Sequence, residues 1–144
     1  MDWPDYFPSD CPPESARSAA GKVYRIILDY QRKGPLLKHF QSQRESQPTR
    51  TQWNDRASEC ERCSISVLED FDESLRLTKV LLDAIPANSR KKGYIAEGSL
   101  KAGYGLVLHS PNERDDLFSH HDWWKPKDVD PSVSFQFCDV VLER

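Results

Sequence analysis

Two histidines, one aspartate and two tryptophans lie within a single short segment, Ser119-His-His-Asp-Trp-Trp-Lys-Pro126. The whole chain has four His and four Trp, so this segment concentrates both residue types. An imidazole gains or loses a proton near neutral pH, and an indole offers a large aromatic face. The segment therefore combines acid–base groups with surfaces on which a base or a nicotinamide ring can stack.

His120 and His121 are neighbours, and adjacent side chains of an extended segment point to opposite sides. We expect one imidazole to face a pocket and the other to cap or pack elsewhere; a surface pair without a role is the alternative. Of Trp123 and Trp124, one is expected to anchor the core, and the other, Trp124, to present a stacking surface to a ligand.

Cys60 and Cys63 form a Cys-x-x-Cys pair, a spacing at which two thiolates can bind one zinc ion. A closed zinc site needs two further ligands, which Cys11, Cys138 or the two histidines would have to supply through tertiary folding. A redox pair is a second interpretation, and inert or partly buried thiols are a third. The sequence favours the third, so zinc is a possible cofactor but not the favoured one.

Arg25 lies within 22–30, a run of β-branched and aromatic residues that predicts a strand. The alternation of a strand puts Arg25 on one face with Val23 and Ile27. A guanidinium among aliphatic neighbours needs a carboxylate, a carbonyl or an anionic ligand, because an unpaired buried charge is costly. Pairing with Asp29, or extension of the side chain to the sheet edge, is the structural interpretation, and contact with an anionic ligand is the functional one.

Other patterns predict the elements around these residues. Residues 1–20 contain four prolines and are expected to form an irregular arm that packs along a domain formed by 21–144. A short helix is predicted over 35–43, a loop anchored by Trp53 over 44–58, and a strand over 64–68. A helix is predicted from a capping box of Asp70 and Glu73 to about Ala84.

Residues 93–98 and 104–109 flank a short turn and predict a hairpin. The alternation of 133–141, with Val133, Phe135, Phe137 and Val141 on one face, predicts the closing strand of a sheet. Together the elements predict one α+β domain of about five mainly antiparallel strands and two helices.

The chain has 144 residues, 38% hydrophobic content and a net charge of −3 at pH 7. This balance favours one domain and argues against wholesale binding to nucleic acid or anionic lipid, with Arg90-Lys91-Lys92 as a local exception. No apolar run reaches membrane-spanning length, and the N-terminus lacks a signal-peptide pattern. We therefore expect a cytoplasmic protein with reduced cysteines, no membrane association, and a nucleotide or a protein as partner.

In chain order, Arg25 on an early strand, Ser64-Ile65-Ser66 on a strand leading into a helix, and a late polar residue resemble the ADP-ribosyltransferase-like fold. The resemblance covers 22–142 in order and element type. In that family an early Arg or His contacts the ribose or phosphate of NAD. A middle Ser or Tyr supports the nicotinamide pocket, and a late Glu orients the nicotinamide ribose, where an acid stabilises oxocarbenium charge.

The resemblance implies a transferase that binds NAD or a related nucleotide, such as a toxin or effector, with Arg25, Ser66 and His121 as its catalytic residues. The substrate-binding residues it implies are Tyr24, Ser64, His120, Trp123 and Trp124. The family's Ser-Thr-Ser and Glu-x-Glu patterns are missing, so the late acid stays open among Asp122, Asp139 and Glu143. The chain also resembles small bacterial proteins that carry a Cys-x-x-Cys before a strand and a His-His-x-Trp-Trp segment, which implies no activity.

The competing hypothesis is a non-catalytic interaction protein: an adaptor, an immunity protein or a partner subunit with an exposed aromatic surface, stabilised by zinc in one version. The two hypotheses differ in where side chains point. An enzyme needs Arg25, a serine of the 64–66 strand and one histidine to converge on one concave site. An interaction protein needs only exposed aromatics, with Arg25 held in a salt bridge.

Overall fold

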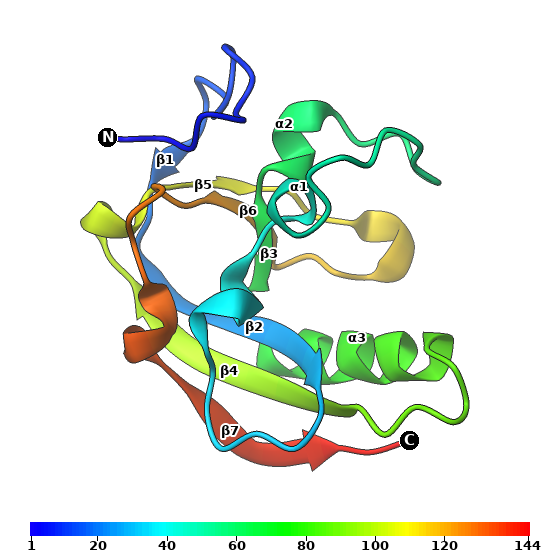
Figure 1. Ribbon diagram of the computed structural model, residues 1–144. Coiled ribbons are helices and arrows are strands. Elements are labelled where there is room, and N and C mark those ends of the chain that lie inside the picture. Colours follow the sequence, from blue (N-terminus) through cyan, green and yellow to red (C-terminus); the bar gives the residue numbers. More distant parts are fainter.

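The strand predicted around Arg25 lies near the middle of a seven-stranded antiparallel sheet in the computed structural model, which describes residues 1–144 (Figure 1). The strands are β1 (Arg17–Ser18), β2 (Gly21–Asp29), β3 (Ile65–Leu68), β4 (Lys92–Leu100), β5 (Leu106–His109), β6 (His120–Trp124) and β7 (Phe135–Leu142). Their order in the sheet is β1-β5-β6-β3-β2-β4-β7.

Three α-helices and four 3-10 turns connect the strands. The helices are α1 (Gln43–Ser46), α2 (Glu59–Arg62) and α3 (Phe71–Ala84). The 3-10 turns are η1 (Leu37–Phe40), η2 (Ala102–Tyr104), η3 (Glu113–Asp115) and η4 (Pro131–Ser134). Only α3 is long enough to cover the sheet, and it packs on β2, β3 and β4. No helix combines the length and the apolar character that crossing a membrane requires.

The chain forms a single α+β domain, as predicted, but the predicted count of five strands and two helices is too low. The additional strands are β1 and β6. A two-residue strand is too short to show alternation, and the polar start of β6 hides its period. The helix predicted over 35–43 is instead the 3-10 turn η1, and the one-turn helices α1 and α2 are too short for helical periodicity to reveal them.

Helix α3 begins where the sequence predicts, but its cap differs from the prediction. The Asp70 side chain accepts a hydrogen bond from the amide of Asp72, as an N-cap does. Glu73 does not reach back to Asp70. Its Oε1 instead accepts from both the amide and the hydroxyl of Ser119, which ties the start of α3 to the start of β6.

The predicted hairpin of 93–98 with 104–109 is wrong. Strand β4 pairs with β2 and β7, whereas β5 pairs with β6 and β1. The chain changes direction at Gly105, whose φ of 114° favours glycine and whose Cα lies so close to Trp124 that a Cβ would come 2.0 Å from the Trp124 carbonyl oxygen. This turn carries β5 away from β4 and places it beside the histidine–tryptophan segment.

Strands β2 and β3 pair at one position only, Tyr24 opposite Leu68, whereas β2 pairs with β4 along its whole length. The sheet therefore consists of two halves, β1-β5-β6-β3 and β2-β4-β7, that diverge from a single bridge. The gap between β2 and β3 is the structural feature on which the site depends.

The main core lies on one side of this divided sheet and buries Val23, Ile27, Phe40, Val67 and Trp123. A smaller cluster joins Cys11, Cys63 and Trp124, with Trp3 and Phe7 of the N-terminal arm packed against it. The arm thus covers the end of β6, and β1 forms its last residues. Val133 lies outside the closing strand, in η4, and is 84% exposed, because β7 begins two residues later than its alternation predicts.

Candidate functional site

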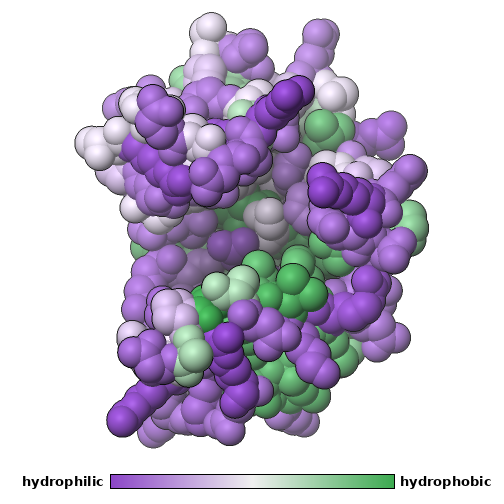
Figure 2. Space-filling model, turned by 90° about the vertical axis from the view of Figure 1, so that its right-hand side faces the viewer, coloured by the Kyte–Doolittle hydropathy of each residue, from purple (hydrophilic) through white to green (hydrophobic).

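A cleft crosses the sheet at β3 and β6, between α3 on one side and residues 55–61 and 110–117 on the other. Two adjoining cavities of about 570 and 410 Å³ form it. The residues that line both are Arg25, Glu61, Ser66, Asn112, His120 and Asp122. Figure 2 faces this side of the molecule and shows a hollow across its middle with hydrophobic surface along the lower border.

Ser66 on β3 stands directly opposite Asp122 on β6 in the sheet register. Directly opposite residues share a face of the sheet, so both side chains point into the cleft. Ser66 is exposed, and its hydroxyl makes no hydrogen bond within the chain. The cleft therefore presents an uncommitted hydroxyl beside a carboxylate.

Arg25 fills the gap between β2 and β3. Its Nε donates to the carbonyl of His39 at 3.0 Å, one terminal nitrogen to the carbonyl of Ser66 at 2.9 Å, and the other to that of Gln41 at 3.5 Å. Burial lowers the pKa of Arg25 to about 10. No carboxylate pairs with it, so the predicted pairing with Asp29 is wrong; Asp29 instead binds Arg32, Lys38 and His39.

A guanidinium has five N–H groups, and the three carbonyls occupy three of them. Two N–H groups of Arg25 are left for a ligand in either cavity. Carbonyl oxygens offer only partial negative charge, so this half-buried cation still favours an anionic partner.

Asp122 is half-buried in the cleft, and burial is the main reason that its pKa is raised above the usual value. Glu61 acts in the same direction because its negative charge is near. The charge of His120 and hydrogen bonds from the hydroxyls of Ser110 and Ser64 act in the opposite direction without cancelling the effect. Asp122 is thus a carboxylate with less solvation than an exposed one, which strengthens its interaction with a positive charge in the cleft.

His120 lies two residues before Asp122 on the same face of β6. Its Nδ1 is 3.0 Å from the carbonyl oxygen of Ser110 and 2.9 Å from the hydroxyl of the same residue. The strand pairing of β5 and β6 continues to this point, because the Ser110 amide also donates to the His120 carbonyl at 2.9 Å. The ring is therefore held in place at the cleft.

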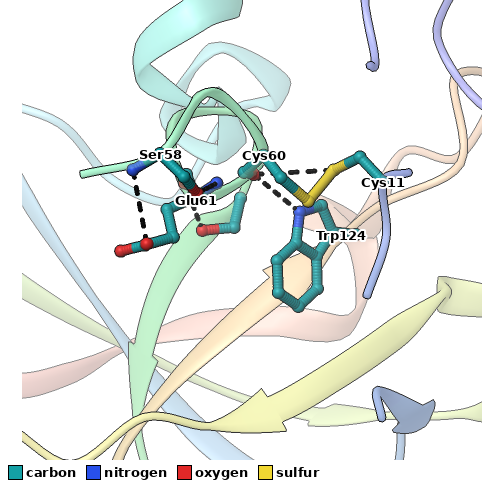
Figure 3. Close-up of a disulfide and its surroundings, with 6 residues drawn as sticks. Cys11, Ser58, Cys60, Glu61 and Trp124 are labelled. Carbon is teal, nitrogen blue, oxygen red and sulfur yellow. Dashed lines mark hydrogen bonds between the residues drawn. A yellow bond between two sulfur atoms is a disulfide. The ribbon is translucent and has the colours of Figure 1, made fainter. Parts of the chain in front are cut away.

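Glu61 reaches the cleft from α2, a one-turn helix held by its N-cap and by a disulfide (Figure 3). Its carboxylate accepts from the Ser58 amide while the Ser58 hydroxyl accepts from the Glu61 amide, which is a capping box. Within the same turn Cys60 is bonded to Cys11 of the arm, and its carbonyl accepts from Trp124 Nε1 at 2.9 Å. The disulfide thus fixes a cleft wall to the core.

Trp53 holds the loop before α2. The guanidinium carbons of Arg44, Arg50 and Arg62 lie 5.5, 4.4 and 4.0 Å from its ring centre. Arg62 also pairs with Asp55 at 2.7 Å, and Asp55 lines the smaller cavity. The loop anchored by Trp53 therefore forms the polar wall of the cleft.

The larger cavity has an aliphatic end built from β2, β3, α3 and the loop before β6, where no aromatic ring lines the surface. The residues that form this end are Ile26, Leu68, Leu77, Leu81 and Leu117. A flat heterocycle can pack on such a surface through dispersion contacts. The cleft as a whole thus offers a hydrophobic end, a polar end, and Arg25, Ser66 and Asp122 where the two cavities meet.

His121, predicted as the catalytic histidine, does not line either cavity. Its Nε2 lies 2.9 Å from Glu69 Oε1, its Nδ1 lies 2.9 Å from the carbonyl of Ser119, and its ring packs on His109. The two histidines do point to opposite sides of the strand, and it is His120 that the register places with Asp122.

The stacking surface predicted at the tryptophans is not present, since Trp123 is 0% and Trp124 1% exposed. Trp123 donates to the carbonyl of Tyr104 at 2.7 Å inside the core, and Trp124 packs under the arm. Tyr24 is also buried, against Phe71 of α3. All three rings are buried in the core, because burial of each removes a large apolar area from water.

The metal site proposed at Cys60 and Cys63 does not fit this structure. Cys60 forms a disulfide with Cys11, so it has no thiolate to offer, and Cys63 is a buried thiol whose pKa burial raises to about 11. No group of three or more His, Cys, Asp or Glu side chains is arranged to hold a metal ion. The expectation of reduced cysteines is wrong for Cys11 and Cys60, which form a disulfide, and the cytoplasmic location stays a prediction.

Of the predicted site residues, the cleft brings together Arg25, Ser64, Ser66 and His120. It adds Asp122, which the sequence left open as one of three late acids, and Glu61, Ser110 and Asn112, which the sequence did not indicate. The one local signal for this site is the alternation along β3, where exposed Ser66 lies between buried Ile65 and Val67. This pattern indicates a polar side chain on an open face of the sheet. Comparison with protein-family models, curated proteins and solved structures finds no match to this chain.

Proposed function

We propose that the cleft binds NAD or a closely related nucleotide and that the protein is an ADP-ribosyltransferase-like enzyme. One observation carries the proposal: Arg25, Ser66 and Asp122 come from three neighbouring strands, β2, β3 and β6, and line one cleft. These are the early cation, the middle hydroxyl and the late acid of the resemblance found in the sequence. The acid is Asp122 rather than a glutamate, and His121 has no part in it.

The shape and charge of the cleft suit a dinucleotide. The volumes of the two cavities lie within the range of roughly 300–1,000 Å³ that small-molecule sites occupy. Arg25 is the permanent cation at their junction and suits a phosphate, whereas the aliphatic end suits a planar ring. The acids nearby suit the positively charged nicotinamide–ribose end of NAD.

The proposed chemistry is cleavage of the bond between the nicotinamide nitrogen and ribose C1′. The electron pair of that bond goes to the ring, which leaves as neutral nicotinamide, while positive charge develops on the ribose. Asp122 stabilises this charge because the partly buried carboxylate is already in place and poorly solvated. Arg25 holds the anionic part of the substrate, and the Ser66 hydroxyl is free to bind the ribose or the carboxamide.

The test is calorimetric titration of the intact protein with NAD, beside thermal unfolding with and without NAD. A ligand that binds only the folded state at 100 times its Kd stabilises it by about 2.7 kcal/mol. We expect saturable binding that Ser66→Ala weakens and Arg25→Lys weakens further. His121→Gln is the matched control, since His121 lies outside the cleft, and should bind as the wild type does.

If NAD binds to the wild type and to the Ser66→Ala and Arg25→Lys variants with equal affinity, the NAD site lies elsewhere on the protein. Absence of any heat or stabilisation at millimolar NAD would remove the proposal. The alternative of an interaction protein loses two of its grounds, because both tryptophans of the predicted aromatic surface are buried and Arg25 has no salt bridge. Exposed aromatic rings remain at Tyr30 and Phe118.

A further inference from the structure

The neighbours of the His120 ring favour one tautomer. Nδ1 lies 3.0 Å from the Ser110 carbonyl oxygen, which can only accept, and 2.9 Å from the Ser110 hydroxyl, whose own proton is donated to Asp122, so a proton on Nδ1 satisfies both contacts. In the neutral ring Nε2 then carries a lone pair, and no group of the chain hydrogen-bonds to it. His120 lines both cavities of the cleft, so it offers an unoccupied base beside Asp122.

We propose that His120 is the general base that activates the acceptor in the reaction of this cleft, and that the acceptor is an oxygen nucleophile: water or the hydroxyl of an alcohol. The inference rests on the proposed function, because it needs the ADP-ribosyl group that cleavage of NAD supplies. It goes beyond that proposal in naming the class of acceptor and the residue that selects it.

The acceptor oxygen forms a bond to ribose C1′ as the bond from C1′ to nicotinamide breaks. The proton of the acceptor O–H passes to Nε2 of His120, and the bonding pair of the broken bond stays on nicotinamide. The imidazolium that results lies next to the Asp122 carboxylate, which stabilises it. The products are neutral nicotinamide, the ADP-ribosylated oxygen and a protonated His120.

Charged groups from every wall of the cleft bear on His120. They are Asp122 on the same strand, Arg25 on β2, Glu61 on α2, Asp115 on η3 and Asp55 in the loop before α2. Four of the five are acids, so the imidazolium that the step produces is surrounded mainly by negative charge. A hydroxyl acceptor needs a base, since an alcohol is a weak nucleophile until its proton is taken, and the unoccupied Nε2 of His120 supplies one.

The experiment follows nicotinamide release and the ADP-ribosyl product from NAD and intact protein, in water, with added methanol and with added agmatine. Methanol is the oxygen acceptor, and agmatine is a guanidine of similar size to an arginine side chain. We expect ADP-ribose in water, a growing share of methyl ADP-ribose with methanol, and no agmatine adduct. His120→Gln should release nicotinamide about 100-fold more slowly while binding NAD as the wild type does.

Two readouts separate a base from a structural residue. The rate of the wild type should fall on the acid side as His120 becomes protonated, and His120→Gln should lose that dependence. Added imidazole should restore part of the rate to His120→Ala, whereas it should do nothing for Asp122→Asn. His121→Gln should show the wild-type rate and pH profile.

The outcomes for the inference and for the proposed function differ. Normal turnover by His120→Gln overturns the base, and an agmatine adduct overturns the oxygen acceptor, while the proposed function stands in both cases. NAD that binds without any nicotinamide release overturns the proposed cleavage and this inference together, and leaves only NAD binding. If the wild type does not bind NAD at all, both fall together. Loss of activity in His120→Ala without rescue by imidazole would assign the residue a purely structural role.

Discussion

The guanidinium of Arg25 donates a 2.9 Å hydrogen bond to the main-chain carbonyl of Ser66, across the gap at which β2 and β3 separate. The contact couples the cation of the cleft to the strand that carries its free hydroxyl. Arg25 therefore has two roles: it ties the two halves of the sheet together, and it presents its remaining N–H groups to the cleft. Substitutions at Arg25 must be interpreted with both roles in mind.

Replacement of Arg25 by alanine should lower the free energy of unfolding by about 2–3 kcal/mol, since three carbonyls lose a charged donor. Urea denaturation measures this loss. Arg25→Lys keeps the charge but not the fork of donors, so its stability should be intermediate. Arg90→Ala, at an exposed arginine, is the control and should change stability by less than about 0.5 kcal/mol. A normally stable Arg25→Ala would contradict the tethering role.

Replacement of Ser66 by alanine should leave stability within about 0.5 kcal/mol of the wild type, because its exposed hydroxyl bonds to nothing in the chain. The affinity for NAD should fall about tenfold, the effect of losing one hydrogen bond of about 1.4 kcal/mol. Calorimetry checks the affinity, with exposed Ser99→Ala as the control. An unchanged Kd would show that the Ser66 hydroxyl does not contact the ligand.

Replacement of Asp122 by asparagine should raise stability and remove activity. The pKa of Asp122 is raised in the folded state, so its ionised form costs stability at pH values above that pKa. Asp122→Asn should therefore unfold at a higher temperature than the wild type at pH 7, and the difference should shrink as the pH is lowered through the native pKa. Nicotinamide release should fall about 100- to 1,000-fold. An Asp122→Asn variant that is less stable at pH 7 would argue against an electrostatic cost.

Removal of the Cys11–Cys60 disulfide by Cys11→Ser should lower the free energy of unfolding by about 2–4 kcal/mol. It should also weaken NAD binding, because the bond holds α2 and hence Glu61 against the cleft. Cys138→Ser, at a half-buried free thiol, is the control for loss of a sulfur atom. Treatment of the wild type with a dithiol should reproduce the effect of Cys11→Ser and leave that variant unaffected.

Replacement of Asp29 by asparagine should destabilise the protein by about 2 kcal/mol at pH 7. Burial alone raises the pKa of Asp29, but hydrogen bonds from His39, Arg32 and the Tyr30 amide outweigh it and hold the pKa well below its usual range. The stabilisation is therefore complete above the ordinary pKa of an aspartate, about 4, and is lost as the pH falls through the native value. Denaturation of the wild type between pH 7 and pH 2 should show this loss, which Asp29→Asn lacks.

Exposed Asp139→Asn serves as the control for that experiment and should follow the wild type. The result also bears on the cleft. Asp29 binds His39, and the carbonyl of His39 accepts from Arg25, so the carboxylate helps to place one of the three acceptors of the guanidinium. If Asp29→Asn keeps both stability and NAD affinity, this chain of contacts has no energetic role.

The amino-acid sequence by itself determined the features that depend on local periodicity. The alternation around Arg25 predicts β2, the spacing of apolar residues after Asp70 predicts α3, and the adjacency of His120 and His121 predicts that they face opposite ways. These features follow from backbone geometry, because side chains alternate along any strand and recur every 3.6 residues along any helix.

Tertiary structure alone decided which of those faces is open. The register that sets Ser66 opposite Asp122 turns His120, and not His121, into the cleft. Trp124 is buried because Trp3 and Phe7, from the far end of the sequence, pack against it. The same N-terminal arm carries Cys11, so Cys60 forms a disulfide with Cys11 and does not pair with Cys63. Such contacts join residues distant in the chain, and no local pattern records which distant segment will cover a given face.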